Sequence, residues 1–315
     1  MKEEVLKKVY IVEQLEYEKD LVHKLFEENK IDHIFLKGSR VRELYPEPWM
    51  RISADVDVLV REDDFKKSGE LLKQSGHTFS RRDEHSESYR SAVNTQLDLH
   101  HDAIPKGRKG YEVAKRVWDD AAIKDGTKHE YLMTTDMLYF IHIAHIAKHF
   151  VMGGGNKYSI TDVIYMKKAY GDKLARTYLE EANLLDFAII IEEIADHDMN
   201  DESISDDAKV VREILLDNIL LGSSRNSEIG WQIIAGGGAK YYKRRLFPPL
   251  EKMKEFYPEL NDHEVLLPIC YIERMIYAFT SGVWKKKAKE IGKKKDITKE
   301  EVKERRLLLE KYHLI

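Results

Sequence analysis

The sequence predicts an α+β protein in which a small mixed or antiparallel sheet with helices precedes a mostly α-helical C-terminal half. Between residues 33 and 100, short runs alternate apolar and polar side chains, as strands with one buried face do, and turn-forming residues separate these runs. From about residue 107 the alternation stops, and apolar residues recur at helical spacing to the end. We therefore expect two domains, residues 1–120 with the sheet and residues 121–315 with helices.

The composition limits the classes of protein to which this chain can belong. Its 315 residues are 43% hydrophobic, enough for one large core or two modest ones. The net charge of −4 argues against a protein that coats nucleic acid, although it allows a local basic patch. One cysteine excludes an internal disulfide and suits a reducing cytoplasm, where we expect the protein to act. No apolar run is long enough to span a bilayer, so no membrane partner is expected, and the oligomeric state is left open.

The first elements along the chain are a helix and a strand that ends in a tight turn. Residues 3–29 have helical spacing, and residues 33–37 read as the first strand. Gly38 allows a tight turn and a close approach of the backbone to a phosphate. Ser39 can cap the following helix, whose first N–H groups would face a triphosphate. Lys37 is either a phosphate contact or solvated flanking charge.

The second strand, residues 55–60, carries two carboxylates on one face. Its three valines point to one side of the sheet, whereas Asp55 and Asp57 emerge together on the other. Carboxylates two residues apart lie roughly 6.6 Å apart and repel by about 2.5 kcal/mol at an effective dielectric of ~20. A bridging cation or a bound proton relieves this repulsion. Arg51, just before the strand, either reaches the phosphates of a nucleotide or neutralises the acids.

A third carboxylate is predicted on a later strand, residues 95–100. There Gln96, Asp98 and His100 share one face. If this strand pairs beside the Asp55–Asp57 strand, Asp98 completes a cluster of three carboxylates. Hard divalent ions such as Mg²⁺ prefer such oxygen ligands together with substrate phosphates. His100 is expected to contact a ligand of the metal or the substrate.

The segment between these two strands reads as one helix and two strands. The helix covers residues 63–74, and the strands cover residues 77–82 and 88–93. The polar side chains in or beside the loop that joins the strands are expected to be solvated; they are Glu84, His85 and Glu87.

These residues together resemble the polymerase β-like nucleotidyltransferases. That superfamily has Gly-Ser at the start of a helix, Asp-x-Asp on the next strand and a lone Asp on a later strand, and Gly38-Ser39, Asp55, Asp57 and Asp98 follow this order. The insertion at residues 45–51 and two later stretches resemble a bacterial branch called the uncharacterised nucleotidyltransferase family. The resemblance implies transfer of an NMP from an NTP such as ATP to an acceptor hydroxyl, with two Mg²⁺ or Mn²⁺ ions.

The resemblance also implies roles for individual residues. The three aspartates would hold the metals, and Asp98 would be the general base for the acceptor. The expected nucleotide-binding residues are Lys37, Gly38, Ser39, Arg51, Lys148 and His149. Asp162 matches a further aspartate of the branch. A small hydroxylated acceptor is preferred to RNA or protein.

The helical half contains one histidine-rich helix. The run Thr134-Thr135-Asp136 is an N-cap signal for a helix over residues 137–150, and His142, His145 and His149 share one face of it. These histidines either bind substrate or are partly buried polar groups of structural value. Further helices are expected over residues 158–170, 175–197 and 267–279.

Two functions other than catalysis are compatible with the sequence. One is a non-catalytic nucleotide-binding regulatory protein that keeps the fold. The other is a nucleic-acid-binding module that uses the lysine-rich tail, residues 285–315, although a solvated helix is the commoner meaning of such a tail.

Overall fold

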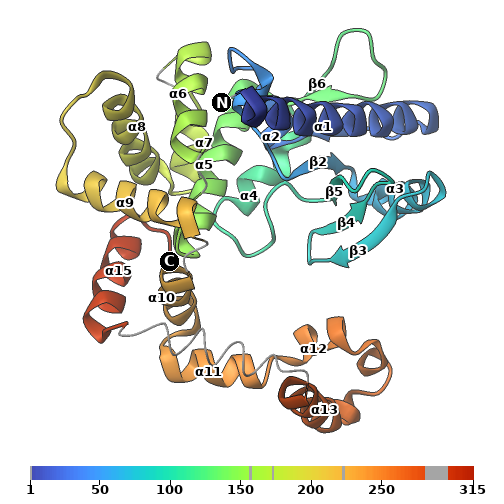
Figure 1. Cartoon of the computed structure of the whole chain (residues 1–315), viewed down its shortest axis with the longest axis vertical. Coiled ribbons are helices and arrows are strands. Elements are labelled where there is room, and N and C mark those ends of the chain that lie inside the picture. The colour runs from blue at the N-terminus through green and yellow to red at the C-terminus, as the bar shows by residue number, and fades with distance from the viewer. Residues whose placement is uncertain (1, 156–157, 172–173, 222–223, 281–296) are drawn as a thin grey trace. The chain divides into compact units, whose positions relative to one another are not determined.

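The computed structural model describes residues 2–155, 158–171, 174–221, 224–280 and 297–315. Their Cα atoms divide into two compact units, Met1–Lys148 with Lys157–Arg212, and His149–Asn156 with Glu213–Ile315. A five-stranded mixed sheet lies in the first unit, and helices dominate the rest, so the predicted α+β class is confirmed (Figure 1). The domains expected at residues 1–120 and 121–315 stay a prediction. No described helix is both long and apolar enough to cross a membrane.

The five-stranded sheet has the order β1-β2-β5-β4-β3. Its strands are β1 (His33–Phe35), β2 (Asp55–Val60), β3 (Thr78–Arg82), β4 (Ser86–Arg90) and β5 (Gln96–His100). β2 and β5 are parallel, and the other three pairs are antiparallel. The crossover between the parallel strands contains α3 (Glu62–Gln74), β3 and β4. A separate two-stranded sheet joins β6 (Ala122–Ile123) to β7 (Tyr131–Leu132).

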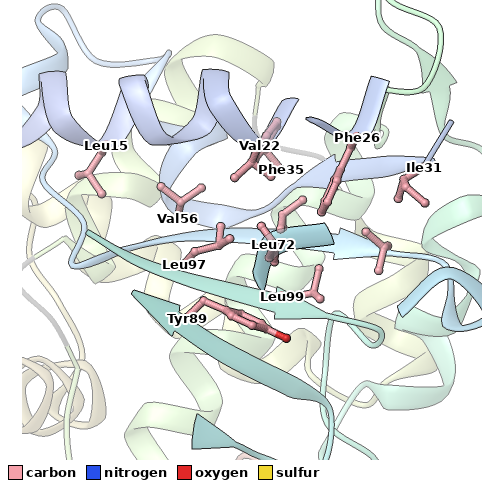
Figure 2. Packing of buried hydrophobic residues seen from close by; sticks show 12 residues of the cluster. Leu15, Val22, Phe26, Ile31, Phe35, Val56, Leu72, Tyr89, Leu97 and Leu99 are labelled. Atoms are coloured by element: carbon pink, nitrogen blue, oxygen red, sulfur yellow. The ribbon is translucent and has the colours of Figure 1, made fainter. Parts of the chain in front are cut away.

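One face of the sheet carries the hydrophobic core of the first unit. Figure 2 shows Leu15, Val22 and Phe26 of α1 (Lys2–Asn29) above the side chains of Val56 and Leu97. The three valines of β2 are 0–1% exposed, as their alternation with the aspartates predicts. This burial leaves the two aspartates of β2 on the opposite face.

The turn after β1 differs from the expectation. Helix α2 spans Lys37–Arg42, so Gly38 and Ser39 lie inside it, and the residue at its N-cap is Leu36. The prediction that Ser39 caps this helix is therefore wrong. The left-handed backbone falls at Lys37, with φ of 35°, and not at Gly38. The Leu36 N–H donates to the Asp57 carbonyl oxygen over 3.0 Å, which fixes the entry to the turn.

The remaining helices of the first unit follow the predicted spacing with one break. They are α4 (Tyr111–Ala114), α5 (Thr135–Val151), α6 (Ser159–Tyr170), α7 (Arg176–Glu181), α8 (Leu185–Asn200) and the start of α9 (Asp206–Leu221), with short 3₁₀ turns at Pro48–Met50 and Lys115–Trp118. Thr134 accepts the N–H of Met137 over 3.2 Å, so its capping role is confirmed. The single helix expected over residues 175–197 is wrong, because Asn183 takes a left-handed φ of 54° between α7 and α8.

The second unit is helical in its described residues. Its elements are α10 (Ser224–Ala235), α11 (Gly238–Leu246), α12 (Leu250–Phe256), α13 (Leu267–Thr280) and α15 (Lys299–Lys311), with 3₁₀ turns at Pro258–Asn261 and Glu264–Leu266. Thr298 and Glu301 form a capping box at the start of α15. Residues 285–296 of the predicted basic tail lie outside the described residues.

Gly230 allows α10 to pack closely on the chain end of α5. A Cβ atom at Gly230 would lie 2.4 Å from the carbonyl oxygen of Val151, closer than real Cβ contacts occur. The Arg305 guanidinium lies 3.9 Å from the Phe150 ring centroid and donates to the Phe150 carbonyl oxygen over 2.6 Å. These contacts hold α10 and α15 to the segment that begins at His149.

Candidate active site

The parallel pairing of β2 and β5 places Asp57 directly beside Asp98. The register joins Asp57 to Asp98 and Asp55 to Gln96. Neighbouring strands lie about 4.8 Å apart, and paired residues point to the same face of a sheet. Asp55, Asp57 and Asp98 therefore share the face opposite the core, and the strand pairing on which the predicted cluster depends is present.

Asp57 has cationic and hydrogen-bonding partners on this face. The Nε2 atom of His100 lies 2.9 Å from Asp57 Oδ1, and Nζ of Lys37 lies 3.5 Å from the same oxygen. Burial alone would raise the pKa of Asp57, but the Lys37 ammonium and the His100 hydrogen bond together hold it well below its usual range. Asp57 is therefore an ionised carboxylate at neutral pH.

Asp55 has the opposite electrostatic surroundings. Burial and the neighbouring carboxylates of Asp57 and Asp98 raise the pKa of Asp55 from 3.8 to about 7, against the opposing effect of Lys37 and Arg51. The repulsion calculated from the strand spacing therefore raises the pKa of one of the three carboxyl groups, that of Asp55. Asp55 holds a proton below neutral pH unless a cation lies near it.

A divalent cation fits the donor atoms gathered here. Asp57, Asp98 and His100 each offer a ligand atom, and these atoms lie within 4.8 Å of one another. Two carboxylates with one imidazole are a suitable donor set for a divalent ion. Asp55 is outside this closest group, but its raised pKa shows that it senses the charge of both other carboxylates.

Cationic side chains surround the carboxylates. The pKa of Lys148 on α5 is lowered by burial and by the nearby Lys37 and Arg108, while Asp57 opposes this effect. Lys148 has no ion pair with a described residue. Positive charges gathered near the carboxylates suit a polyanionic ligand that arrives with a cation. Arg108 was not among the residues predicted from the sequence, because it lies in an irregular segment that carries no motif.

Two side chains expected to be solvated are not. The ring of His85 is half-buried, with its centroid 5.3 Å from that of His100. Burial, His100 and Lys148 lower the pKa of His85 to about 3, so the ring is neutral. Glu87 is 5% exposed on the core face of β4 and accepts a hydrogen bond from the Tyr89 hydroxyl. The expectation is wrong because both residues precede or belong to β4, which is covered on both faces; Glu84 is exposed.

Arg51 is paired with a carboxylate distant in sequence. Its guanidinium donates to Asp162 of α6 through Nη2 over 2.9 Å and Nε over 3.3 Å. Asp162 is 0% exposed and also accepts the Tyr45 hydroxyl over 2.5 Å. Nε2 of His142 lies 3.7 Å from Asp162, and burial lowers the pKa of this histidine. His142 is thus a buried member of this network, which joins α5 and α6 to the loop before β2.

The Arg51 network contacts the turn that carries Gly38. A Cβ atom at Gly38 would lie 3.1 Å from Ser53 Cβ and 3.2 Å from Arg51 Nη1. The absence of a side chain at Gly38 therefore leaves space for Arg51 and Ser53, which lie in the loop before β2. The sequence alone does not reveal this packing reason for a glycine. Ser39 is 3% exposed in the same helix.

Of the residues predicted to bind a nucleotide, the structure brings Lys37 and Lys148 to the carboxylates. The Arg51 guanidinium instead packs beside Gly38 and donates hydrogen bonds to Asp162. His149 falls in the second compact unit, whereas its neighbour Lys148 falls in the first.

The comparisons with known proteins give one family. The model of a family described as uncharacterised nucleotidyltransferase matches residues 2–196. No curated protein matches the chain. This result confirms the resemblance drawn from the Gly-Ser, Asp-x-Asp and Asp motifs.

Three solved structures share similarity at low identity. The antibiotic-resistance factor ANT(2'')-Ia has 10% identity and a TM-score of 0.38, over 57% of this chain and 94% of that one. An antigenic nucleotidyltransferase-like protein from Paracoccidioides brasiliensis has 17% identity and a TM-score of 0.36, over 61% and 90%. A tRNA-processing enzyme has 13% identity and a TM-score of 0.29, over 96% and 97%. Since the family model covers more than half of the chain, the protein belongs to the family of uncharacterised nucleotidyltransferases.

Proposed function

We propose that this protein is a divalent-metal-dependent enzyme that transfers an NMP from an NTP to the hydroxyl of an acceptor. The observation that supports this most strongly is the parallel register of β2 and β5, which sets Asp57 beside Asp98 with Asp55 on the same face. Three carboxylates beside an ordinary sheet would repel one another without compensation. A cation that binds together with the substrate would compensate this repulsion.

Asp55, Asp57 and Asp98 are the proposed ligands of two Mg²⁺ or Mn²⁺ ions, and the position of His100 allows it to hold Asp57 in place. When bound, such ions neutralise the phosphates and stabilise the charge that develops during an in-line displacement. Lys37 already contacts Asp57. We propose that its ammonium turns to the triphosphate once a cation occupies the carboxylates.

Asp98 is the proposed general base. It would accept the proton of the acceptor hydroxyl as the hydroxyl oxygen bonds to the α-phosphorus of the NTP. The bond from that phosphorus to the leaving pyrophosphate breaks in the same step. Catalysis then consists mainly of positioning and charge neutralisation.

The triphosphate site is proposed around the cationic side chains. Lys37 and Lys148 supply positive charge near Asp57, and Arg108 adds a further charge near Lys148. The backbone of Gly38 and Ser39 is proposed to lie beside the triphosphate. Arg51, held by its ion pair with Asp162, packs against Gly38 and would keep this backbone in place. His149 is retained as a nucleotide contact on the family resemblance.

The test measures both nucleotide binding and product formation. The metal-stripped protein is incubated with each α-labelled NTP, Mg²⁺ or Mn²⁺, and either a small-molecule extract or total RNA, and products are identified by mass spectrometry. A labelled small molecule is expected, with Asp57→Asn and Asp98→Asn each reducing its formation more than about 100-fold.

Asp20→Asn is the matched control, because it removes an exposed carboxylate of α1 outside the site. Transfer by the Asp57 or Asp98 variant at the rate of the parent protein would refute the mechanism. Calorimetric NTP binding with no product from any acceptor would favour the regulatory alternative.

A further inference from the structure

A second cluster of possible metal ligands lies at the other end of the sheet. It joins His23 of α1, His33 of β1 and Glu130, which immediately precedes β7. One ligand atom from each lies within 4.8 Å of the other two. His33 pairs with Val60, at the opposite end of β2 from Asp55, so this cluster is separate from the carboxylates described above.

The distances within this cluster match the edges of a coordination tetrahedron. Nδ1 of His23 lies 3.3 Å from Nε2 of His33 and 3.1 Å from Oε2 of Glu130. Ligands that lie 2.0–2.1 Å from a tetrahedral zinc ion are separated from one another by roughly 3.3 Å. Two of the three distances between the ligand atoms therefore match the spacing around a shared ion, and the third is within 4.8 Å.

The hydrogens available in the cluster cannot satisfy all three atoms. Nδ1 of His33 faces the Ile31 carbonyl oxygen over 2.9 Å, so this nitrogen carries the hydrogen and Nε2 presents a lone pair. His23 Nδ1 has at most one hydrogen, which faces both this lone pair and the Glu130 carboxylate. When His23 carries its hydrogen on Nε2 instead, three lone pairs face one another, and one cation would satisfy them together.

The surroundings hold the three side chains in place, as outer-shell groups do at metal sites. The His33 ring is 0% exposed and meets the edges or faces of Phe26 and Phe35, with ring centroids 5.5 Å away in both cases. The other oxygen of Glu130 accepts Lys124 Nζ over 2.8 Å.

The loop that carries Glu130 is fixed by Glu27. Its carboxylate accepts the backbone N–H groups of Lys128, His129 and Glu130 over 2.6–3.2 Å. These contacts attach the loop to α1, one turn from His23. The side chain of His23 is 26% exposed, which leaves room for solvent at a fourth position.

We propose that His23, His33 and Glu130 form a structural metal site for zinc or a similar borderline divalent ion. Two imidazoles with one carboxylate are a donor set that suits Zn²⁺ better than Mg²⁺. The ion would join α1 and β1, which are adjacent in sequence, to the β6–β7 hairpin, which is distant from both. This site is independent of the proposed nucleotidyl transfer.

The experiment removes the catalytic carboxylates first, so that zinc has no competing site there. In the full-length Asp57→Asn/Asp98→Asn protein, stripped by chelator, equilibrium dialysis against Zn²⁺ is expected to give one bound ion per chain. His23→Gln and Glu130→Gln, made in that background, should each weaken zinc binding by at least about 100-fold, the upper end of what loss of an outer-shell partner costs.

His197→Gln is the matched control, because this histidine lies on α8 and contacts the Glu202 carbonyl oxygen instead. It should bind zinc as tightly as the background protein. A background protein without stoichiometric zinc, or a His23 variant or control that breaks this pattern, overturns the proposal. If either ligand variant fails to fold, ¹⁵N spectra of histidine rings in the background protein decide: zinc must shift the signals of His23 and His33, and unchanged signals overturn the site.

Discussion

Replacing Asp55 with asparagine is expected to stabilise the metal-free protein while it removes activity. Asparagine keeps the shape of the side chain and removes its charge. Burial, Asp57 and Asp98 raise the pKa of Asp55 from 3.8 to about 7, and each pKa unit corresponds to about 1.4 kcal/mol. The full shift is worth about 4 kcal/mol. Because the side chain is only half-buried, solvent screening reduces our expected gain to about 2 kcal/mol.

The pH dependence identifies the cause of this gain. A carboxyl group whose folded pKa lies above its unfolded value destabilises the folded protein increasingly as pH rises from about 4 to 7. The advantage of Asp55→Asn should therefore be complete at pH 8 and nearly absent at pH 4. The same titration predicts that the parent protein binds Mg²⁺ more weakly below pH 7, where a proton occupies Asp55.

Thermal unfolding in the presence of chelator measures the effect. A gain of about 2 kcal/mol corresponds to about 4–8 °C in a unit of this size. Asp20→Asn on α1 is the control and should change the melting temperature little at either pH. An Asp55→Asn protein that melts at or below the parent temperature at pH 8, or that keeps its gain at pH 4, would refute the argument from repulsion.

Two further variants test the supports of the site and of the second unit. Arg51→Gln removes the ion-pair partner of the buried Asp162 carboxylate and should lower the free energy of unfolding in urea by about 3–5 kcal/mol. The control Arg212→Gln breaks a partly exposed ion pair between α9 and α8 and should lower it by under about 1 kcal/mol. Similar costs for the two variants would show that the Asp162 pair does not contribute more than an exposed pair. Gly230→Ala should destabilise the protein by at least about 1–3 kcal/mol and increase proteolysis of α10, because its Cβ would meet the Val151 carbonyl oxygen at 2.4 Å; unchanged unfolding and proteolysis would show that the helices separate at little cost.

Local patterns in the sequence were enough to identify the five strands of the main sheet and one face of the site, although β4 begins two residues before its predicted range and the short strands β6 and β7 were missed. Alternation in β2 and β5 identifies the buried and polar sides, because each residue's face follows from its position alone. The sequence did not establish that β2 and β5 pair, because local patterns do not determine which strands are neighbours in a sheet. The family motifs supplied the reason to expect that Asp98 joins Asp55.

The tertiary contacts that hold the site residues in place could not be predicted from local patterns. Arg51 and Asp162 were both singled out in the sequence, but their pairing depends on the tertiary fold, which brings together residues that are 111 positions apart. The packing role of Gly38 depends on a guanidinium that arrives from a later loop. The burial of Glu87 follows from β4 being covered by α3, where a Cβ at Gly69 would meet the Glu87 carboxylate at 3.1 Å.

The parallel register of β2 and β5 has a consequence for how mutations act. Because side chains alternate, a slip of one residue between these strands would turn Asp98 toward the valines and bring Leu97 or Leu99 to the polar side. Any such slip also buries a carboxylate in the core, so the misaligned protein is unstable as well as inactive. Insertions in the β3–β4 hairpin, by contrast, lengthen the connection without altering the alignment.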